Sequence, residues 1–283
     1  MLQCRMALNS VPQNSAAGDF LKQAILLAAY GAGGIQGMSA LRFFESMVRQ
    51  AFPCASVRWA FTSALSRRRL ANIRRKSDSV QKALCRLGFE RYDQVVVQSL
   101  HLIPGSEHEG LLAEARAVSG GAPPDIRVGG PLLRGDGDVE EAARVMLAHA
   151  PEERLAEEAV IWVGHGTGHK GKTAYASLGE AVSALDPHTF VGVLSGTPDL
   201  PHILERLRGQ GINRAWLMPL FSVLGKHAVE DVSGEGGSAW AAVLRRNGII
   251  CRSVLRGLGD YEGFAALWLH RLQEAARQER TPV

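Results

Sequence analysis

Short apolar runs rich in valine, isoleucine and leucine recur along the chain, and longer segments with helical periodicity separate them. Strands that are apolar throughout and alternate with helices are typical of a parallel sheet covered on both faces. The pattern therefore predicts a doubly wound α/β fold. The predicted strands are Ala24–Tyr30, Ser56–Phe61, Gln94–Ser99, Asp125–Gly129, Ala159–Val163, Phe190–Leu194, Arg214–Leu220 and Ile249–Val254.

The polar stretch Pro151–Glu158 is the expected boundary between two halves. We expect a disordered lead over residues 1–23, an N-terminal α/β domain over 24–152 and a C-terminal α/β domain over 153–283. We leave open whether the C-terminal helix of the second domain packs on the first domain. The predicted helices are Gly37–Ala51, Ala64–Leu87, Glu107–Ser119, Val139–Ala148, Thr173–Leu185, Leu200–Gly209, Ser238–Arg246 and Tyr261–Arg277.

The two halves also resemble each other in how they open. The first begins with LLAAYGAGG (Leu26–Gly34) and the second with IWVGHGTGH (Ile161–His169), so that Tyr30 and His165 are counterparts. Each residue follows an apolar strand and lies in a glycine-rich turn. The likeness favours a duplicated α/β unit.

A second pair of segments supports the same duplication. SLHLIPGSE (Ser99–Glu107) parallels PLFSVLGKH (Pro219–His227), which makes Glu107 and His227 counterparts. In open parallel sheets, ligands bind beyond the carboxyl ends of the strands. Two such domains facing a central cleft would place Tyr30 and His165 around that cleft together with this second pair.

Composition narrows the range of functions. The four cysteines lie far apart without a CxxC pair, which argues against a zinc ribbon or a redox dithiol. No apolar run approaches the roughly 18 residues that span a bilayer, and the N-terminus lacks the apolar core of a secretory signal. We expect a cytoplasmic protein without a membrane partner, and leave a homo-oligomer open.

Much of the net charge of +4 comes from the basic stretch Arg67–Arg75. No interleaved aromatic residues or nucleic-acid module accompany this stretch, so nucleic acid is not an expected partner. Two interpretations remain open, a solvated helix face and the attraction of a ligand with many carboxylates.

The turn VGHGTGH carries the first candidate for chemistry. His165 follows a predicted strand and is flanked by Gly164 and Gly166, which let the backbone turn sharply beside a bulky ligand. With Gly168, the glycine spacing does not match GxGxxG, which disfavours an ordinary nucleotide-binding α/β protein.

Two further loops carry candidates past strand ends. In MPLFSVLGKHAVEDV, His227 precedes a predicted helix, and neutral imidazole both ligates divalent metals and accepts protons near neutral pH. In QSLHLIPGSEH, His101 and Glu107 could contribute a proton relay or a metal route, and His108 is expected at the surface.

Together, these three loops resemble the anaerobic sirohydrochlorin cobaltochelatases, a branch of the class II tetrapyrrole chelatases related to ferrochelatase. The resemblance covers the chain from Ile25 to Ala275. QSLH, the GHG turn and MPL…GxHAxxD occur in this order and are specific only in combination. The supporting segments are Ala60–Leu70, Val95–Leu111, Gly129–Leu133, Val163–Lys170, Trp216–Val232 and Leu255–Leu272.

The resemblance implies a bilobal fold with the tetrapyrrole in the cleft between the domains. The implied reaction, of the lyase class, is insertion of Co²⁺ into sirohydrochlorin for cobalamin synthesis, with release of two protons and no nucleotide hydrolysis. Cobalt is then a substrate, and no permanently bound cofactor is expected. In the family, the histidine that falls on His165 binds the metal and accepts a proton, and the one that falls on His227 is a second ligand.

This chain departs from the family at two positions. A glutamate ligand of the family falls on Ser195, whose hydroxyl is a poor ligand for a divalent metal. We expect Glu107 from across the cleft, or solvent, to complete the coordination sphere, unless the site is weak by design. The turn Tyr30–Gly34 also lacks the threonine and serine usual in relatives; Tyr30 could stack on the ring, hydrogen-bond it or serve packing. Tyr30, His101 and Ser195 are the expected tetrapyrrole contacts.

Two alternatives remain open from the sequence. Imidazole ligation hardly discriminates among metals, so iron or nickel could be the inserted ion. With Ser195 in place of an acidic ligand, the protein could also be a non-catalytic tetrapyrrole or metal carrier.

Overall fold

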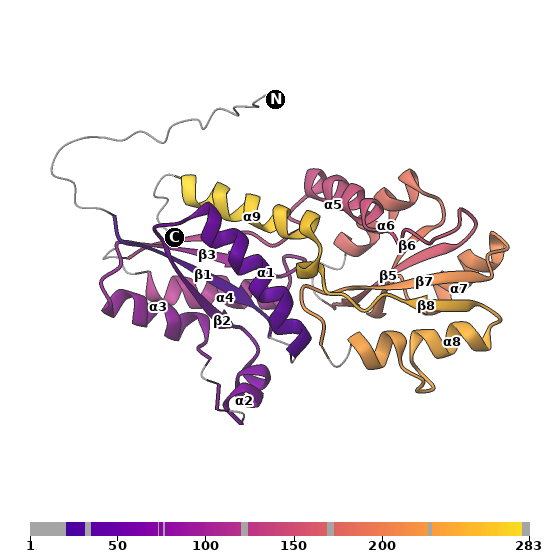
Figure 1. Ribbon diagram of the computed structural model, residues 1–283, viewed down its shortest axis with the longest axis horizontal. Coiled ribbons are helices and arrows are strands. Elements are labelled where there is room, and N and C mark those ends of the chain that lie inside the picture. The colour runs from indigo at the N-terminus through magenta and orange to yellow at the C-terminus, as the bar shows by residue number, and fades with distance from the viewer. Residues whose placement is uncertain are drawn as a thin grey trace, which may run out of the picture.

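The computed structural model describes residues 21–31, 35–72, 74–75, 77–119, 124–168, 173–225 and 228–278. It contains two four-stranded sheets in which every strand pairs in parallel (Figure 1). The first has the order β2-β1-β3-β4 and the second the order β6-β5-β7-β8, so the two halves share one topology. The fold class predicted from the sequence is confirmed. The strands are β1 (Gln23–Ala29), β2 (Ser56–Phe61), β3 (Gln94–Ser99), β4 (Asp125–Gly129), β5 (Ala159–Gly166), β6 (Thr189–Ser195), β7 (Arg214–Leu220) and β8 (Ile250–Ser253).

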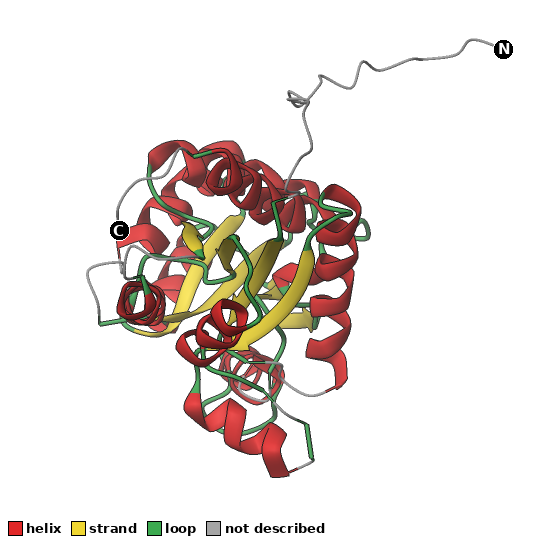
Figure 2. Cartoon of the chain, turned by 90° about the vertical axis from the view of Figure 1, so that its left-hand side faces the viewer, coloured by secondary structure: helices red, strands yellow, loops and turns green. Residues whose placement is uncertain are grey.

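Helices connect the strands and cover the sheets (Figure 2). None of the helices in the described ranges is long and apolar enough to cross a membrane. The α-helices are α1 (Ile35–Ala51), α2 (Ala64–Asn72), α3 (Val80–Phe89), α4 (Ser106–Val118), α5 (Asp136–Ala148), α6 (Thr173–Leu185), α7 (Leu200–Gly209), α8 (Trp240–Arg246) and α9 (Glu262–Arg277), and short η2 (Ala228–Val232) and η3 (Leu258–Asp260) turns precede α8 and α9.

The single helix predicted over Ala64–Leu87 is wrong, because the chain leaves the helix after Asn72. Asp78 forms a parallel bridge with Ala60, and its carbonyl accepts a hydrogen bond from the Phe61 amide at 3.0 Å. Ser79 then caps α3 by accepting from the amide of Lys82 at 3.3 Å. A tertiary backbone contact and a local cap together outweigh continuous helix propensity here.

Alternate residues of the central strands pack into different cores. In β5, Val160 and Trp162 belong to a core that also contains Ile25 and Val96 of the first sheet. Their neighbour Ile161 belongs to a separate core beneath α7 and α8. Because one apolar cluster includes side chains of both sheets, the two halves are packed together rather than joined by a linker alone.

The C-terminal helix α9 crosses back to the first half and lies over its sheet (Figure 1). Trp268 of α9 is fully buried beside Phe44 of α1. Arg127 of β4 donates to the carbonyl of Ala276 at 2.8 Å, and the buried guanidinium of Arg271 pairs with Asp138 at 2.7 Å. The end of the chain therefore contributes to the core of the first sheet.

Candidate functional site

The loops that follow β3 and β7 meet between the two halves. The hydroxyl of Ser222, in the MPLFSVLGKH segment, donates a hydrogen bond to the carbonyl of Leu100, in QSLH. Phe221 and Ser222 are held from the other side, where their carbonyls accept from the amides of Leu258 at 2.7 Å and Gly259 at 3.0 Å. The carboxyl ends of the two sheets thus face each other. In open parallel sheets, ligands bind at this end of the strands.

A fourth segment of the sequence, GGPLL (Gly129–Leu133), joins the same cluster of loops. The amide of Leu132 donates to the carbonyl of His101 at 3.0 Å, and the amide of Leu133 donates to that of Leu102 at 2.9 Å. These bonds lay the GGPLL segment along the loop after β3. Loop backbone at this edge is therefore fixed by hydrogen bonds rather than left to solvent.

His165 lies in the last residues of β5 with an exposed side chain. The next residue, Gly166, has a φ of +79°, and a Cβ there would lie 1.9 Å from the carbonyl oxygen of Ser195. A Cβ on Gly164 would lie 2.5 Å from the ring of Tyr175. Both flanking glycines are thus required by close packing, and they leave the imidazole between them open to solvent.

The imidazole of His165 also contacts the loop after β7. Its ring centroid lies 6.3 Å from that of Phe221, with the planes tilted by 42°. Phe221 precedes Ser222, whose hydroxyl reaches the QSLH loop. The three loops singled out in the sequence therefore form one connected cluster. His227, expected to be the second metal ligand, lies outside the described residues.

Ser195 is the last residue of β6 and is exposed. It pairs with Gly166 in the β5–β6 register, so it lies at the same sheet edge as His165. The residues that follow are Gly196, Thr197 and Pro198, and the next acidic side chain, Asp199, caps α7 by accepting a hydrogen bond from the amide of His202 at 3.1 Å.

Tyr30 occupies the corresponding position after β1 in the first half. Its side chain is 55% exposed, and its carbonyl accepts a hydrogen bond from the amide of Ser63 at 3.1 Å. The next residue, Gly31, is packed against α2, because a Cβ there would lie 2.2 Å from the hydroxyl oxygen of Ser66. The aromatic ring is therefore available to a ligand while the backbone around it is held.

Polar side chains at the end of β3 form a buried row of hydrogen bonds. The Ser99 hydroxyl lies 2.9 Å from Nδ1 of His101 and 2.9 Å from Nδ1 of His108. Nε2 of His101 lies 3.3 Å from the hydroxyl of Thr62, at the end of β2. His108 was expected at the surface, and that prediction is wrong: α4 turns the residue inward, where it is buried.

Burial controls the charge of both histidines in this row. It lowers the pKa of His101 to about 4, and the neighbouring His108 acts in the same direction. Burial also lowers the pKa of His108, against a smaller opposing effect of Glu109. Both imidazoles are neutral near pH 7. Since the Ser99 hydroxyl has one proton, it donates to one imidazole and accepts from the other, which sets opposite tautomers on the two rings.

Glu107 is exposed in the first turn of α4, where a carboxylate interacts favourably with the helix N-terminus. Within the described ranges, no group of three histidine, cysteine, aspartate or glutamate side chains converges so as to hold a metal ion. The structure therefore brings together the loops of the candidate site, but it does not show a complete set of ligands in its described part.

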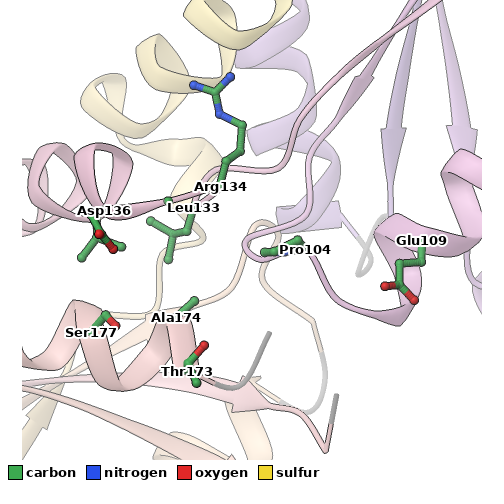
Figure 3. A pocket seen from close by; sticks show the side chains of 10 residues that line it. Pro104, Glu109, Leu133, Arg134, Asp136, Thr173, Ala174 and Ser177 are labelled. Atoms are coloured by element: carbon green, nitrogen blue, oxygen red, sulfur yellow. The ribbon is translucent and has the colours of Figure 1, made fainter. Parts of the chain in front are cut away.

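A cavity of about 250 Å³ opens beside this cluster, between the first turns of α5 and α6 (Figure 3). It is smaller than the roughly 300–1,000 Å³ typical of small-molecule sites, and none of the candidate site residues lines it. We therefore do not place the macrocycle in it. Its lining residues are Pro104, Glu109, Leu133, Arg134, Gly135, Asp136, Val139, Thr173, Ala174 and Ser177.

Sequence reasoning missed three contributors to this cluster, namely Ser99, Phe221 and Ser222. A signal for Ser99 was present, because Gln98 and Ser99 are polar residues that directly follow the apolar run Val95–Val97 of β3. Such residues, when buried, need hydrogen-bond partners. Phe221 and Ser222 are ordinary loop residues whose contacts depend on the other half of the molecule.

Two facing parallel sheets with open side chains at their carboxyl ends define a chelatase-like fold. A solved structure of SirB from Bacillus subtilis with Fe³⁺ superposes with a TM-score of 0.62, covering 90% of this chain and 96% of SirB. Its sequence identity is 15%, so this likeness concerns the fold.

The sequence identifies the family within that class. The family model for cobalt chelatase (CbiK) matches residues 23–277. The sirohydrochlorin cobaltochelatase CbiKC of Nitratidesulfovibrio vulgaris strain Hildenborough is 47% identical over 255 residues, which is 90% of each chain. The sirohydrochlorin cobaltochelatase of Salmonella typhimurium is 30% identical over 223 residues, 76% of this chain and 81% of the relative. The chain belongs to the cobalt chelatase (CbiK) family.

Proposed function

We propose that this protein inserts Co²⁺ into sirohydrochlorin, with release of two protons and without nucleotide hydrolysis. The observation that carries the proposal is 47% identity over 90% of both chains to a sirohydrochlorin cobaltochelatase. The convergence of the QSLH, GHG and MPLFS loops at facing strand ends supports it, because a ligand held there would touch both halves.

We assign the two central roles to the second half. His165 accepts a pyrrole proton and, with His227, holds the incoming ion over the ring face. Its exposure between two glycines and its position at a strand end support this assignment. A neutral imidazole suits both steps, because it ligates divalent metals and takes up protons near neutral pH.

The remaining coordination positions belong to weaker groups. A serine hydroxyl at Ser195 brings no negative charge to the ion, so we assign a carboxylate from the first half or solvent to that place. Glu107 is the candidate carboxylate, and its exposure in the first turn of α4 leaves it free to turn toward the cleft. A weakly held ion suits a chelatase, which must release its metal to the macrocycle.

We assign His101 to the scaffold and Tyr30 to the macrocycle. His101 is 8% exposed and both its ring nitrogens contact hydroxyls, so it has no free edge for a ligand. Tyr30 is open and lies at the carboxyl end of β1, where its ring can stack on a flat tetrapyrrole.

The test is a spectrophotometric assay of purified protein with sirohydrochlorin and Co²⁺, run beside Fe²⁺ and Ni²⁺. We expect metal insertion well above the uncatalysed rate, fastest with cobalt. Tight macrocycle binding without faster insertion would identify a carrier instead. Faster insertion of iron or nickel would keep the reaction class and change the metal.

The assay also bears on the partners. We propose cobalt as a substrate that leaves with the product, so the isolated protein should lose it on dialysis. The cytoplasmic location and the oligomeric state remain predictions, which cell fractionation and sedimentation would check.

A further inference from the structure

Helix α2 and the turn after it form a cationic projection from the first half (Figure 1). None of the residues of α2 is buried, and three of its nine residues are arginines. We call the exposed side chains Arg68, Arg69, Arg74 and Arg75 the α2 arginine patch. A helix without a buried face gains little from packing, so its composition needs another explanation.

The charge of this region is not balanced locally. Residues 46–77 contain no aspartate or glutamate. None of the four guanidinium groups of the α2 arginine patch pairs with a carboxylate of the described chain. The next acidic residue along the chain, Asp78, is engaged by Lys82 at 3.2 Å and Arg86 at 2.9 Å. Like charges held close together repel, so this arrangement favours an anionic ligand.

The patch is held together by the backbone. Arg74 has a φ of 58°, in the left-handed region, and its amide donates to the carbonyl of Ala71 at 2.9 Å. The amide of Arg75 donates to the carbonyl of Leu70 at 2.9 Å. The chain thus curls back on the end of α2, which keeps Arg74 and Arg75 at the last turn of the helix that carries Arg68 and Arg69.

The start of the helix that carries the patch adjoins the candidate site. Ser66 of α2 contacts Gly31, the residue after Tyr30, closely enough to exclude a Cβ there. Arg67 anchors the helix by donating to the carbonyl of Phe61, and to that of Thr62 at 2.8 Å. Because α2 begins directly past the carboxyl end of β2, the helix starts at the sheet edge at which ligands of this fold bind and projects from there (Figure 1).

We infer that the α2 arginine patch binds peripheral carboxylates of the tetrapyrrole substrate, an inference that rests on the proposed function. Sirohydrochlorin carries many carboxylates around its rim, and guanidinium groups bind carboxylates with charge-assisted hydrogen bonds. The patch acts in substrate binding and selects macrocycles rich in carboxylates. It takes no part in moving the metal or the pyrrole protons.

The experiment compares two double variants of the patch with a control variant, and each of the three loses two positive charges. R68Q/R69Q and R74Q/R75Q each remove two charges from the patch. The control R245Q/R246Q removes two from the end of α8, which precedes the start of β8 and so lies at the amino edge of the second sheet. The dissociation constant of metal-free sirohydrochlorin is measured by quenching of tryptophan fluorescence, and KM and kcat are measured with Co²⁺.

Each patch variant should raise the dissociation constant and KM about tenfold, the sum expected of two exposed ion pairs, with kcat within about twofold of the native value. The difference should shrink as salt is added. The control should bind as the native protein does. A porphyrin with few carboxylates should bind the patch variants and the native protein equally.

Equal binding of sirohydrochlorin by native protein and both patch variants would overturn the inference. So would an equal loss of affinity in the control, which would show that net charge alone is responsible. A thermal unfolding midpoint near that of the native protein confirms that each variant is folded. Absence of metal insertion by the native protein would refute the proposed function, while the binding comparison would still decide the role of the patch.

Discussion

The two halves share one strand order, but the polar residues at the end of β3 in the first half and at the ends of β5 and β6 in the second half differ in exposure. In the first half, Ser99, His101 and His108 are buried and hydrogen-bonded to one another. In the second half, His165 and Ser195 end their strands exposed. The comparison teaches that strand ends of a duplicated fold can divide their roles: the end of β3 holds loops in place, while the ends of β5 and β6 present open side chains.

The difference has a local physical cause. In the second half, Gly164 and Gly166 allow β5 to run on beside Tyr175 and the backbone of Ser195, which leaves His165 uncovered. In the first half, α4 begins soon after β3 and buries His108 against Ser99. Burial then keeps those imidazoles neutral, whereas an exposed imidazole can exchange protons and bind ions.

The largest effect should come from His165→Ala. Loss of the proton acceptor and one metal ligand should lower the insertion rate about a hundredfold or more, with little change in macrocycle affinity. The rate is measured spectrophotometrically with sirohydrochlorin and Co²⁺. The control is His270→Ala on α9, an exposed histidine paired with Glu274 at 3.1 Å. Native activity in His165→Ala would mean that the second half is not the reactive one.

The second-largest expected effect is a dependence of the free energy of unfolding on pH, which His101 causes. Its pKa is about 4 in the folded protein, against 6.5 for an ordinary histidine, so the native state disfavours protonation. This contribution is complete above about pH 6.5 and is lost as the pH falls toward 4, at a cost of about 3 kcal/mol. Urea unfolding of native protein and His101→Gln across this range measures it.

Between pH 6.5 and 4, the His101→Gln variant should lose about 3 kcal/mol less unfolding free energy than the native protein. His270→Gln removes an exposed histidine and should keep the native profile. If the profile of His101→Gln matches that of the native protein, the buried row does not hold His101 neutral, and the contrast between the halves fails.

The substitution Gly166→Ala should cause a smaller loss of unfolding free energy. The new Cβ would require a left-handed conformation at φ +79° and would overlap the carbonyl of Ser195, for a cost of about 2 kcal/mol or more. Gly168→Ala is the matched control, since a Cβ there would meet no atom within 4 Å. Equal unfolding free energies for the two variants would show that the GHG turn is not constrained as described.

The smallest effect should follow Ser195→Glu, which places a carboxylate at the strand end beside Gly166. Cobalt affinity measured by calorimetry should rise about tenfold, because an anionic oxygen is a better ligand than a hydroxyl. Ser195→Gln has a side chain of the same length without the charge and should leave affinity near the native value. If neither affinity nor insertion rate rises in the glutamate variant, the missing ligand is not the limitation.

Much of the fold could be predicted because its signals are local. Ser56–Phe61, Gln94–Ser99, Asp125–Gly129 and Arg214–Leu220 are strands with the predicted bounds. The break between α2 and α3 was missed, since it depends on a bridge between Asp78 and Ala60.

For the candidate site, the motifs identified the loops but not all of their contacts. The QSLH, GHG and MPLFS segments were predicted to share one cleft, and contacts of Leu100, His165 and Phe221 connect them. The burial of His108 could not be read from its spacing, because an isolated polar residue in a first helical turn gives no periodic signal. His227 and its ligand role remain predictions.

By itself, the sequence determined the alternation of strands and helices, the duplication and the family, because apolar periodicity and motifs are properties of neighbouring residues. The tertiary structure alone decided which strand-end side chains are covered and which are open, and that Ser222 reaches Leu100 from the other half. Burial and hydrogen bonding of a polar side chain depend on what packs against it from distant segments, and that information is not local.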